Sequence, residues 1–421
     1  MPPVSTHNAA SMQARAVRLI AFAGADPGDL ALVAGLAMGA AALFAFGIVD
    51  YRERILSTND FAGFWAGARL IVLGIDPYDP ALYRPAIVLL GTQHPDVTVF
   101  GYPPWMALVL LPFGFLPLPL ASGLWTAAGL IAGVYALRAL LHAVLPELPF
   151  VHWLAGFTLL ASQPGLATFF NGQWAFLLLA VSIGIFLLQA EHPRVAGLLA
   201  ICAFAKPQLF TFAAWSWLSA AHARGRLVPF ASIAVGGVIL IVVATLIAAP
   251  VALASWWTNV FLWRVSDPTT PTLSAAFADL LGTGGQFAAV GVLFLALGVA
   301  LRLRPGSLGW WSLWPVMSLL GATYTHSYDQ LLLLPPLILS TAVVAARSRR
   351  RAIGYAALWG TLMLPGSMLL QGLAAYRDRE NFTVLLTMAV FVAIAVATRG
   401  ETRRTEASQT VAAALPSATL S

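Results

Sequence analysis

Three side chains in this 421-residue sequence have the chemistry to move a proton and to bind an anion. Asp60 is a single carboxylate that follows the first long apolar segment and precedes a short amphipathic run, Phe61–Leu73. Lys206 is the one lysine in the chain and lies in the apolar stretch AICAFAKPQLFTF; His326 lies in the motif YTHSYD. A positioned carboxylate can act as a general base, while an ammonium group or an imidazole can bind a phosphate. The three residues are therefore candidates for a general base and for phosphate binding.

Five further polar residues are weaker candidates for substrate contacts. They lie at the ends of apolar segments, where a side chain can reach water and membrane together: Tyr102, Asn171, Gln173, Ser274 and Asp329. Gln173 could hydrogen-bond a sugar hydroxyl, and Asp329 could orient His326.

Structural roles compete with each of these interpretations. Asp60 and Ser274 are suited to helix N-caps, and the pair Asn171-Gly172 is suited to a helix C-cap. Lys206 could extend along the apolar surface to place its ammonium group at the interface. Ser327 or Asp329 could cap the helix that follows His326, and Asp76 and Asp79 fit a turn that merely reverses the chain.

The composition identifies a membrane protein. Hydrophobic residues make up 59% of the chain and charged residues 10%, with a mean hydropathy of +0.82. A soluble domain has about 25% charged residues. The apolar segments are continuous, which predicts helices and excludes a β-barrel pattern. The net charge of +6 resides in short Arg clusters between apolar segments, so it predicts membrane orientation and no nucleic-acid partner.

The predicted fold is all-α, a polytopic membrane helix bundle of about ten to twelve transmembrane helices with external juxtamembrane helices. Candidate spans, each near the ~20 residues that cross a bilayer, are 30–49, 118–141, 151–168, 173–190, 227–249, 286–302, 308–323, 329–346, 352–373 and 382–398. Trp105–Leu116 is apolar but short, so we interpret it as a juxtamembrane helix. The domain organisation is then a cytoplasmic segment 1–29, a membrane domain 30–398 and a disordered cytoplasmic tail 399–421.

The Arg clusters set the expected orientation. Arg347–Arg351 (RSRRR) is the strongest cytoplasmic marker, and the positive-inside rule places both termini in the cytoplasm of a multi-pass cell (inner) membrane protein. The segment 195–221 agrees with this only as a hairpin of two short helices that turns at Lys206-Pro207, since proline disfavours helix in the residue before it. Asp60, Asn171, Lys206 and His326 then share the external face.

Several motifs are missing from the sequence. It has no Walker loop, no dinucleotide fingerprint and no His/Cys metal spacing, and no span holds paired carboxylates. We therefore expect no cofactor, and a metal is doubtful. The span interiors hold almost no ionisable residues, which disfavours ion-coupled transport.

Seven short motifs occur in order on the predicted external face: Asp60, GIDPYD at 74–79, YPPW at 102–105, NGQ at 171–173, AKP at 205–207, the Leu273-Ser274 loop and HSYD at 326–329. Together they resemble membrane glycosyltransferases of the C-type fold, and they are most similar to glycosyltransferase family 87. That family includes polyprenol-phosphate-mannose-dependent α-mannosyltransferases. The resemblance spans roughly residues 30–345.

The resemblance implies an inverting hexosyltransferase. It implies that Asp60 is the base on the acceptor hydroxyl and that Lys206 and His326 bind the donor phosphate. The donor would be a polyprenyl-phosphate sugar, with mannose expected, and the acceptor a glycan or glycolipid, so the partners are membrane lipids and no nucleic acid. A lipid-linked sugar flippase or small-solute transporter is the alternative function, and a scaffold subunit of an envelope-polymer synthase is a third.

Overall fold

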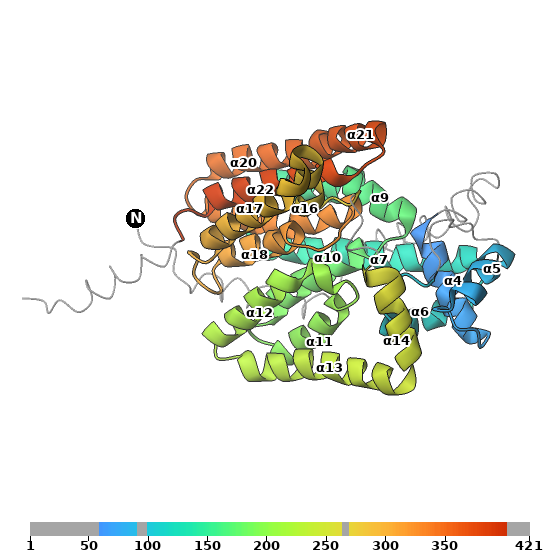
Figure 1. Ribbon diagram of the computed structural model, residues 1–421. Helices are drawn as coiled ribbons and strands as arrows, with labels where there is room; N and C mark the ends of the chain where they lie inside the picture. Colours follow the sequence, from blue (N-terminus) through green and yellow to red (C-terminus); the bar gives the residue numbers. More distant parts are fainter. Residues whose placement is uncertain (1–58, 91–98, 263–268, 402–421) are drawn as a thin grey trace, which may run out of the picture.

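A computed structural model describes residues 59–90, 99–262 and 269–401 (Figure 1). Within these ranges every regular element is a helix, which confirms the all-α prediction. The segment 1–29, the span 30–49 and most of the tail predicted from residue 399 lie outside the described residues.

Three short helices, α4 (Asp60–Val72), α5 (Pro80–Leu89) and α6 (Pro104–Gly114), form one end of the molecule (Figure 1). Proline at the first helical position starts α5 and α6, where its missing N–H costs nothing. Helices α4 and α6 pack closely at Gly114, because glycine has no side chain there. A Cβ at this position would lie 2.7 Å from the backbone of Ala68. The short apolar helix predicted at 105–116 is therefore α6.

The next four helices are α7 (Leu118–Val144), α8 (Pro149–Ala161), α9 (Gln163–Asn171) and α10 (Ala175–Leu188). The single span predicted at 151–168 is wrong, because the chain breaks at Ser162. The extended backbone of Ser162 ends α8, and its side chain accepts a hydrogen bond from Gly165 N to cap α9. Helices α9 and α10 then meet at an angle of 117°.

The break predicted at Lys206-Pro207 within 195–221 is confirmed, while the reversal of the chain into a hairpin stays a prediction. Helix α11 (Pro193–Ala203) ends before Lys206, a short 3₁₀ turn η1 (Pro207–Leu209) follows, and α12 (Thr211–Ala223) begins after it. The chain continues through α13 (Leu227–Ala248), α14 (Pro250–Trp256) and the π-helical turn η2 (Trp257–Phe261).

The described residues from 269 onward contain eleven more helical elements, the last of which is α22. In chain order they are α16 (Leu273–Leu281), η3 (Gly282–Gly284), α17 (Gly285–Ala300), α18 (Leu308–Leu320), η4 (Ser327–Leu333), α19 (Leu334–Ala345), α20 (Arg349–Thr361), η5 (Leu362–Gly366), α21 (Ser367–Arg377), η6 (Asn381–Thr383) and α22 (Val384–Ala397). Helices α18 and α19 form the centre of this part and pack against α22.

Five helices in the described residues are long and apolar enough to cross a membrane, or six if the bent pair α9 and α10 counts as one span. They are Leu118–Val144, Leu227–Ile247, Leu273–Ala300, Ser327–Ala345 and Arg349–Arg377. The remaining apolar helices are shorter, so ten to twelve full-length spans are not seen. The protein is nevertheless a polytopic all-α membrane protein.

Burial separates the helices that face lipid from those that form the core. On α13, Val228 is 76% exposed and Ile247 is 79% exposed, although the helix is apolar throughout. On α18, Trp310 and Trp314 are about fully buried, at 1% exposure each. A large exposed apolar face on a long helix is the pattern of a membrane surface.

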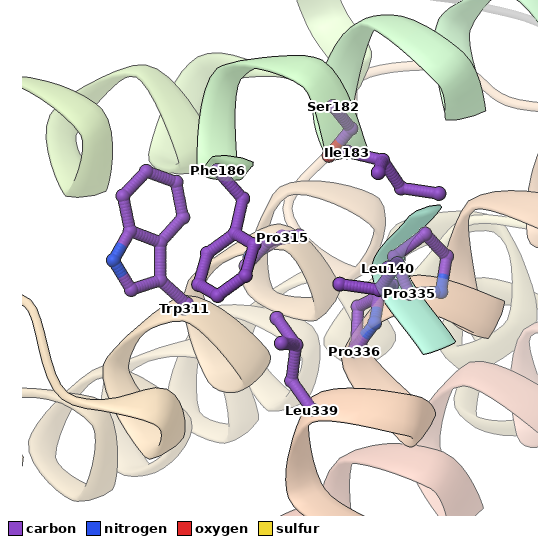
Figure 2. A pocket seen from close by; sticks show the side chains of 9 residues that line it. All are labelled: Leu140, Ser182, Ile183, Phe186, Trp311, Pro315, Pro335, Pro336 and Leu339. Atoms are coloured by element: carbon purple, nitrogen blue, oxygen red, sulfur yellow. The ribbon is translucent and has the colours of Figure 1, made fainter. Parts of the chain in front are cut away.

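Figure 2 shows a cavity of about 10 Å³ between α7, α10, α18 and α19. Its lining is apolar apart from one hydroxyl, and consists of Leu140, Ser182, Ile183, Phe186, Trp311, Pro315, Pro335, Pro336 and Leu339. A space of this size holds at most about one water molecule. The cavity has no ionisable side chain, so it is not a site for chemistry.

Charged residues collect at the end of the bundle where the links after α12, α17 and α19 meet the end of α22 (Figure 1). Arg224 donates to the carbonyl oxygen of Gly306 at 3.2 Å, and Arg347 donates to that of Ala397 at 3.2 Å. We call this region, with Glu401, the basic end. Among the described residues, Arg224 and Arg347 therefore both bind backbone at this end, and the orientation of the end in the membrane stays a prediction.

Candidate active site

Asp60 is the first residue of α4, and α4 lies at the opposite end of the molecule from α12 (Figure 1). The prediction that it caps this helix is wrong. Asn59 is the N-cap, and its side chain accepts a hydrogen bond from Ala62 N at 3.0 Å. A carboxylate in the first turn is also favoured by the positive end of the helix dipole. The capping duty therefore falls to Asn59, and Asp60 is directed to other side chains.

The side chain of Gln173 donates a hydrogen bond from Nε2 to Oδ2 of Asp60. Gln173 is placed by the sharp turn between α9 and α10, where Gly172 adopts φ +61° as the C-cap of α9. The predicted C-cap at Asn171-Gly172 is thus confirmed at Gly172. Trp125 donates to the carbonyl oxygen of Gly172 at 2.8 Å and fixes the turn against α7.

Gln173 also accepts a hydrogen bond, and this second contact extends the network to α11. Its Oε1 lies 3.3 Å from Nζ of Lys206 and 3.5 Å from the hydroxyl of Tyr102. An ammonium group can only donate, so the oxygen of the amide must face Lys206 and its nitrogen must face the carboxylate of Asp60. The amide therefore connects a carboxylate to a cation with its orientation determined by both.

Lys206 is buried, at 5% exposure, and pairs with Asp329, at 1% exposure. Its Nζ lies 2.8 Å from Oδ1 of Asp329 and 4.7 Å from the ring centre of Tyr328. Asp329 is held in turn by the backbone N–H of His326, at 3.1 Å, and by the hydroxyl of Thr325, at 3.4 Å. The alternative in which the lysine extends to the interface is wrong, because its charge is compensated inside the protein.

We call the four connected residues Asp60, Gln173, Lys206 and Asp329 the site network. They come from α4, the α9–α10 turn, the α11–η1 link and η4, so four distant parts of the sequence meet in it. The helix break at Lys206 and the turn at Gly172 are what bring the side chains together. The sequence pattern predicted both.

His326 lies next to the site network, between Tyr328 and the link that joins α21 to η6. Its ring stacks on Tyr328 with centres 5.0 Å apart, and its Nδ1 lies 3.7 Å from Oε2 of Glu380. Glu380 also accepts hydrogen bonds from Ser327, at 3.3 Å from the backbone N–H and 3.2 Å from the hydroxyl. Glu380 is therefore connected to η4, although the three residues before it are exposed.

The electrostatic surroundings of Glu380 favour its charged form. Burial by itself raises its pKa, but the hydrogen bond and charge of His326 and the two hydrogen bonds from Ser327 outweigh burial, so the pKa lies below the ordinary value. Glu380 is a site residue that sequence reasoning missed. Its neighbours Arg377 and Arg379 pair with Asp279 of α16, which gave the loop its surface-like pattern.

Two predicted residues do not join the site network. Ser274 is exposed on α16, and Thr272 caps that helix in its place by accepting from Ala275 N at 3.1 Å. Asn171 is the last residue of α9, and it makes no hydrogen bond to the network within the described residues. Asp76 and Asp79 have the turn roles expected of them, accepting from Tyr78 N at 2.9 Å and Ala81 N at 2.8 Å.

Buried donors without partners flank the site network in the sequence. Within the described residues, Asn59 Nδ2, Trp174 Nε1 and Gln208 Nε2 are buried and make no hydrogen bond. Each is within two residues of Asp60, Gln173 or Lys206. Buried donors are nearly always satisfied in a folded protein, so these groups are candidates for contacts with a polar substrate. In the same ranges no group of three or more His, Cys, Asp or Glu side chains is arranged to hold a metal ion.

A polytopic helical membrane protein with a carboxylate, a lysine and a histidine gathered at one end of the bundle has the features of a membrane-embedded transferase. The sequence model of glycosyltransferase family 87 matches residues 100–323, slightly more than half of the chain. The chain belongs to this family and is a membrane glycosyltransferase. A search of curated proteins and a search of solved structures gave no significant match.

The matched range contains Tyr102, Gln173 and Lys206 but not the whole site. Asp60 precedes it, while His326, Asp329 and Glu380 follow it. The complete site is therefore assembled by helices from both sides of the matched range.

Proposed function

We propose that this protein transfers a hexose, with mannose the expected sugar, from a polyprenyl-phosphate donor to a hydroxyl group of a glycan or glycolipid. The site would lie at the extracytoplasmic surface of the cell membrane. Support comes from the family, from the lipid-facing helices around the site, and from the arrangement of acid and base groups in it. A lipid-linked donor and a membrane-bound acceptor can both reach such a site by diffusion in the bilayer.

In the proposed reaction, the carboxylate of Asp60 takes the proton of the acceptor hydroxyl. The hydroxyl oxygen forms a bond to the anomeric carbon of the sugar as the bond from that carbon to the phosphate oxygen breaks. The polyprenyl phosphate leaves with the electron pair. Attack on the face opposite the leaving group inverts the anomeric configuration, so a β-linked donor gives an α product.

Lys206 and His326 would stabilise the negative charge that develops on the leaving phosphate. Preorganised donors of this kind are worth about 3 to 4 kcal/mol of barrier each in other enzymes. Asp329 positions Lys206 at 2.8 Å, and Gln173 ties the same ammonium group to Asp60. The observation that carries the proposal is this connected network, in which the side chain of Gln173 joins the proposed base, Asp60, to the proposed phosphate-binding cation, Lys206.

The role of Asp60 is tested by Asp60→Asn, which keeps the size of the side chain but removes the base. Transfer of a labelled sugar from polyprenyl phosphate in proteoliposomes should fall by about 10² to 10⁴-fold, the usual contribution of general base catalysis. Asp79→Asn is the matched control, because Asn caps a helix as well as Asp and Asp79 only caps α5.

Turnover of Asp60→Asn at the wild-type rate would contradict the assignment of the base. Recovery of intact donor on the far side of the bilayer, with no transfer by the wild-type protein, would instead favour a flippase.

The orientation is tested by labelling single cysteines with a membrane-impermeant thiol reagent in a Cys202→Ala background. Asp378 is exposed two residues before Glu380, and Arg350 is exposed at the basic end. We expect Asp378→Cys to react from outside intact cells and Arg350→Cys to react only after lysis. The reverse pattern would overturn the extracytoplasmic placement of the site.

A further inference from the structure

The carboxylates in and beside the site network oppose the binding of a negatively charged donor phosphate. Lys206 is already paired with Asp329, and Asp60 and Glu380 add two more carboxylates nearby. An approaching phosphate therefore meets a lysine whose charge is compensated. Binding of the phosphate by Lys206 alone would therefore be weak, and the placement of the His326 ring becomes important for the reaction.

We propose that Glu380 is a positioning residue that acts through His326, a role that rests on the proposed function. Its Oε2 lies 3.7 Å from Nδ1 of His326, on the edge of the imidazole. A carboxylate at this edge attracts the ring and, together with the capping box that joins the His326 side chain to the backbone N–H of Asp329, limits how the ring can turn. Nε2 would then be the atom that meets the phosphate.

The surroundings of His326 hold the ring in place from two directions. Tyr328 covers one face, with an interplanar angle of 25°, and the same Tyr328 ring lies 4.7 Å from Nζ of Lys206. Glu380 contacts the ring edge. The imidazole and the ammonium group are therefore positioned by a shared aromatic ring, and Glu380 completes the placement of the imidazole.

Glu380 is itself anchored to η4, although its side chain is 36% exposed. Both of its oxygens accept hydrogen bonds from Ser327, and Gln330 donates to the carbonyl oxygen of Thr383 at 2.7 Å across the same junction. Ser327 also accepts from Gln163 of α9 at 3.2 Å. The α21–η6 link is thus tied to the helix turn that contains His326 and Asp329.

A purely structural alternative exists, in which Glu380 only caps the start of η4 through Ser327. The two roles differ in what they predict for Glu380→Gln. The amide retains an oxygen that can accept from Ser327, but it loses the negative charge beside His326. A capping role would survive this change, whereas a role through the imidazole would not.

The test is a double-mutant cycle that measures sugar transfer and thermal unfolding for the wild-type protein, Glu380→Gln, His326→Asn and the double variant. We expect Glu380→Gln to lower kcat by about 10 to 100-fold, as for other residues that orient a functional histidine, without changing the unfolding temperature. In the His326→Asn background the same change should alter kcat by less than about twofold, because the two residues act as one unit. Asp378→Asn is the matched control, since Asp378 is an exposed carboxylate at φ +54°, a conformation that Asn tolerates.

The proposal would be overturned if Glu380→Gln lowered kcat equally in the wild-type and His326→Asn backgrounds. It would also be overturned if Glu380→Gln alone had the wild-type kcat. Glu380→Asp, which restores the charge, should recover part of the rate if the role is electrostatic.

Failure of the proposed function would give a different result from failure of the role of Glu380. If the wild-type protein used some other sugar donor, the polyprenyl-phosphate donor would be wrong, and the same cycle with the donor it does use would still decide the role of Glu380.

Discussion

The two ends of the bundle use charged side chains in different ways. At the basic end, charged groups bond mainly to the backbone: Arg224 and Arg347 donate to carbonyl oxygens, and Glu401 accepts from Gly309 N at 2.6 Å. Arg224 also makes a side-chain contact there, to Oε1 of Gln189 at 3.4 Å. At the site end, Asp60, Gln173, Lys206 and Asp329 bond to one another through their side chains. Only about 10 to 15% of protein hydrogen bonds join two side chains, so a run of three is unusual.

This difference separates structural charges from functional ones. A charged side chain at a helix end can hydrogen-bond to the backbone N–H or C=O groups that have no partner within the helix, and this stabilises the fold. A buried lysine paired with a buried aspartate gains little, because the loss of hydration offsets the attraction between them. The arrangement at the site end is therefore better explained by what it does to a substrate than by stability.

Asp329→Asn should have the largest effect on stability among the changes that test this comparison. It leaves Lys206 buried without its counter-charge, and removing one partner of a buried pair costs about 3 to 5 kcal/mol. We expect a marked fall in the unfolding temperature of the purified protein in detergent, followed by far-ultraviolet circular dichroism.

The double variant Lys206→Met, Asp329→Leu is the control that sharpens this result. Replacing a buried ion pair with apolar residues of similar size is often neutral for stability, so the double variant should unfold near the wild-type temperature and yet transfer no sugar. A double variant that unfolds as early as Asp329→Asn would show that the pair itself stabilises the fold, and would remove the distinction between the two ends.

Two glycines with left-handed backbones give a matched comparison of the same ends. Gly172 has φ +61° at the site end and Gly225 has φ +66° near the basic end. A Cβ on Gly172 would lie 2.6 Å from Cβ of Phe61, whereas a Cβ on Gly225 would meet nothing within 4 Å. Both substitutions by alanine incur a backbone cost of about 1 to 2 kcal/mol, but only Gly172→Ala also displaces the residue next to Asp60.

We therefore expect Gly225→Ala to lower the unfolding temperature slightly and to leave the kcat of the folded protein unchanged. Gly172→Ala should lower the unfolding temperature further and should reduce kcat as well. Equal kcat values for the two variants would mean that the placement of Asp60 relative to Gln173 does not limit transfer.

Much of the fold and part of the site could be predicted from the sequence. Long apolar runs and the proline at position 207 indicated the helices and the break beside Lys206, since both signals are local. The position of Gly172 as a C-cap was likewise a local signal. These features led to the prediction that Asp60, Asn171, Lys206 and His326 share one face, and the structure joins Asp60 and Lys206 through Gln173.

What could not be predicted depends on packing between distant helices. The capping role of Asn59 was missed because Asp60 fits an N-cap equally well by residue type. Glu380 was missed because its neighbours are charged and exposed, and only the fold shows that its side chain turns toward Ser327 and His326. The break at Ser162 was missed although the sequence contains a local signal for it, because Ser162-Gln163-Pro164-Gly165 interrupts the apolar run with an N-cap residue and a proline.

Glu401 at the basic end should give the smallest effect. Burial raises its pKa, against the opposing effects of the Gly309 hydrogen bond and the nearby Arg347. The folded state therefore holds the proton of Glu401 more tightly than the unfolded chain does. This group contributes stability at low pH and loses that contribution as the pH rises through its raised pKa, which lies above the ordinary value of 4.5.

Glu401→Gln stays neutral at every pH and can still accept the hydrogen bond from Gly309. The stability of this variant between pH 4 and pH 7, followed by thermal unfolding, should therefore vary less than that of the wild type and differ from it by at most about 1 kcal/mol. A larger loss at pH 7 would show that the charge of Glu401 is needed at the basic end, and that its bond to the backbone does not account for its role.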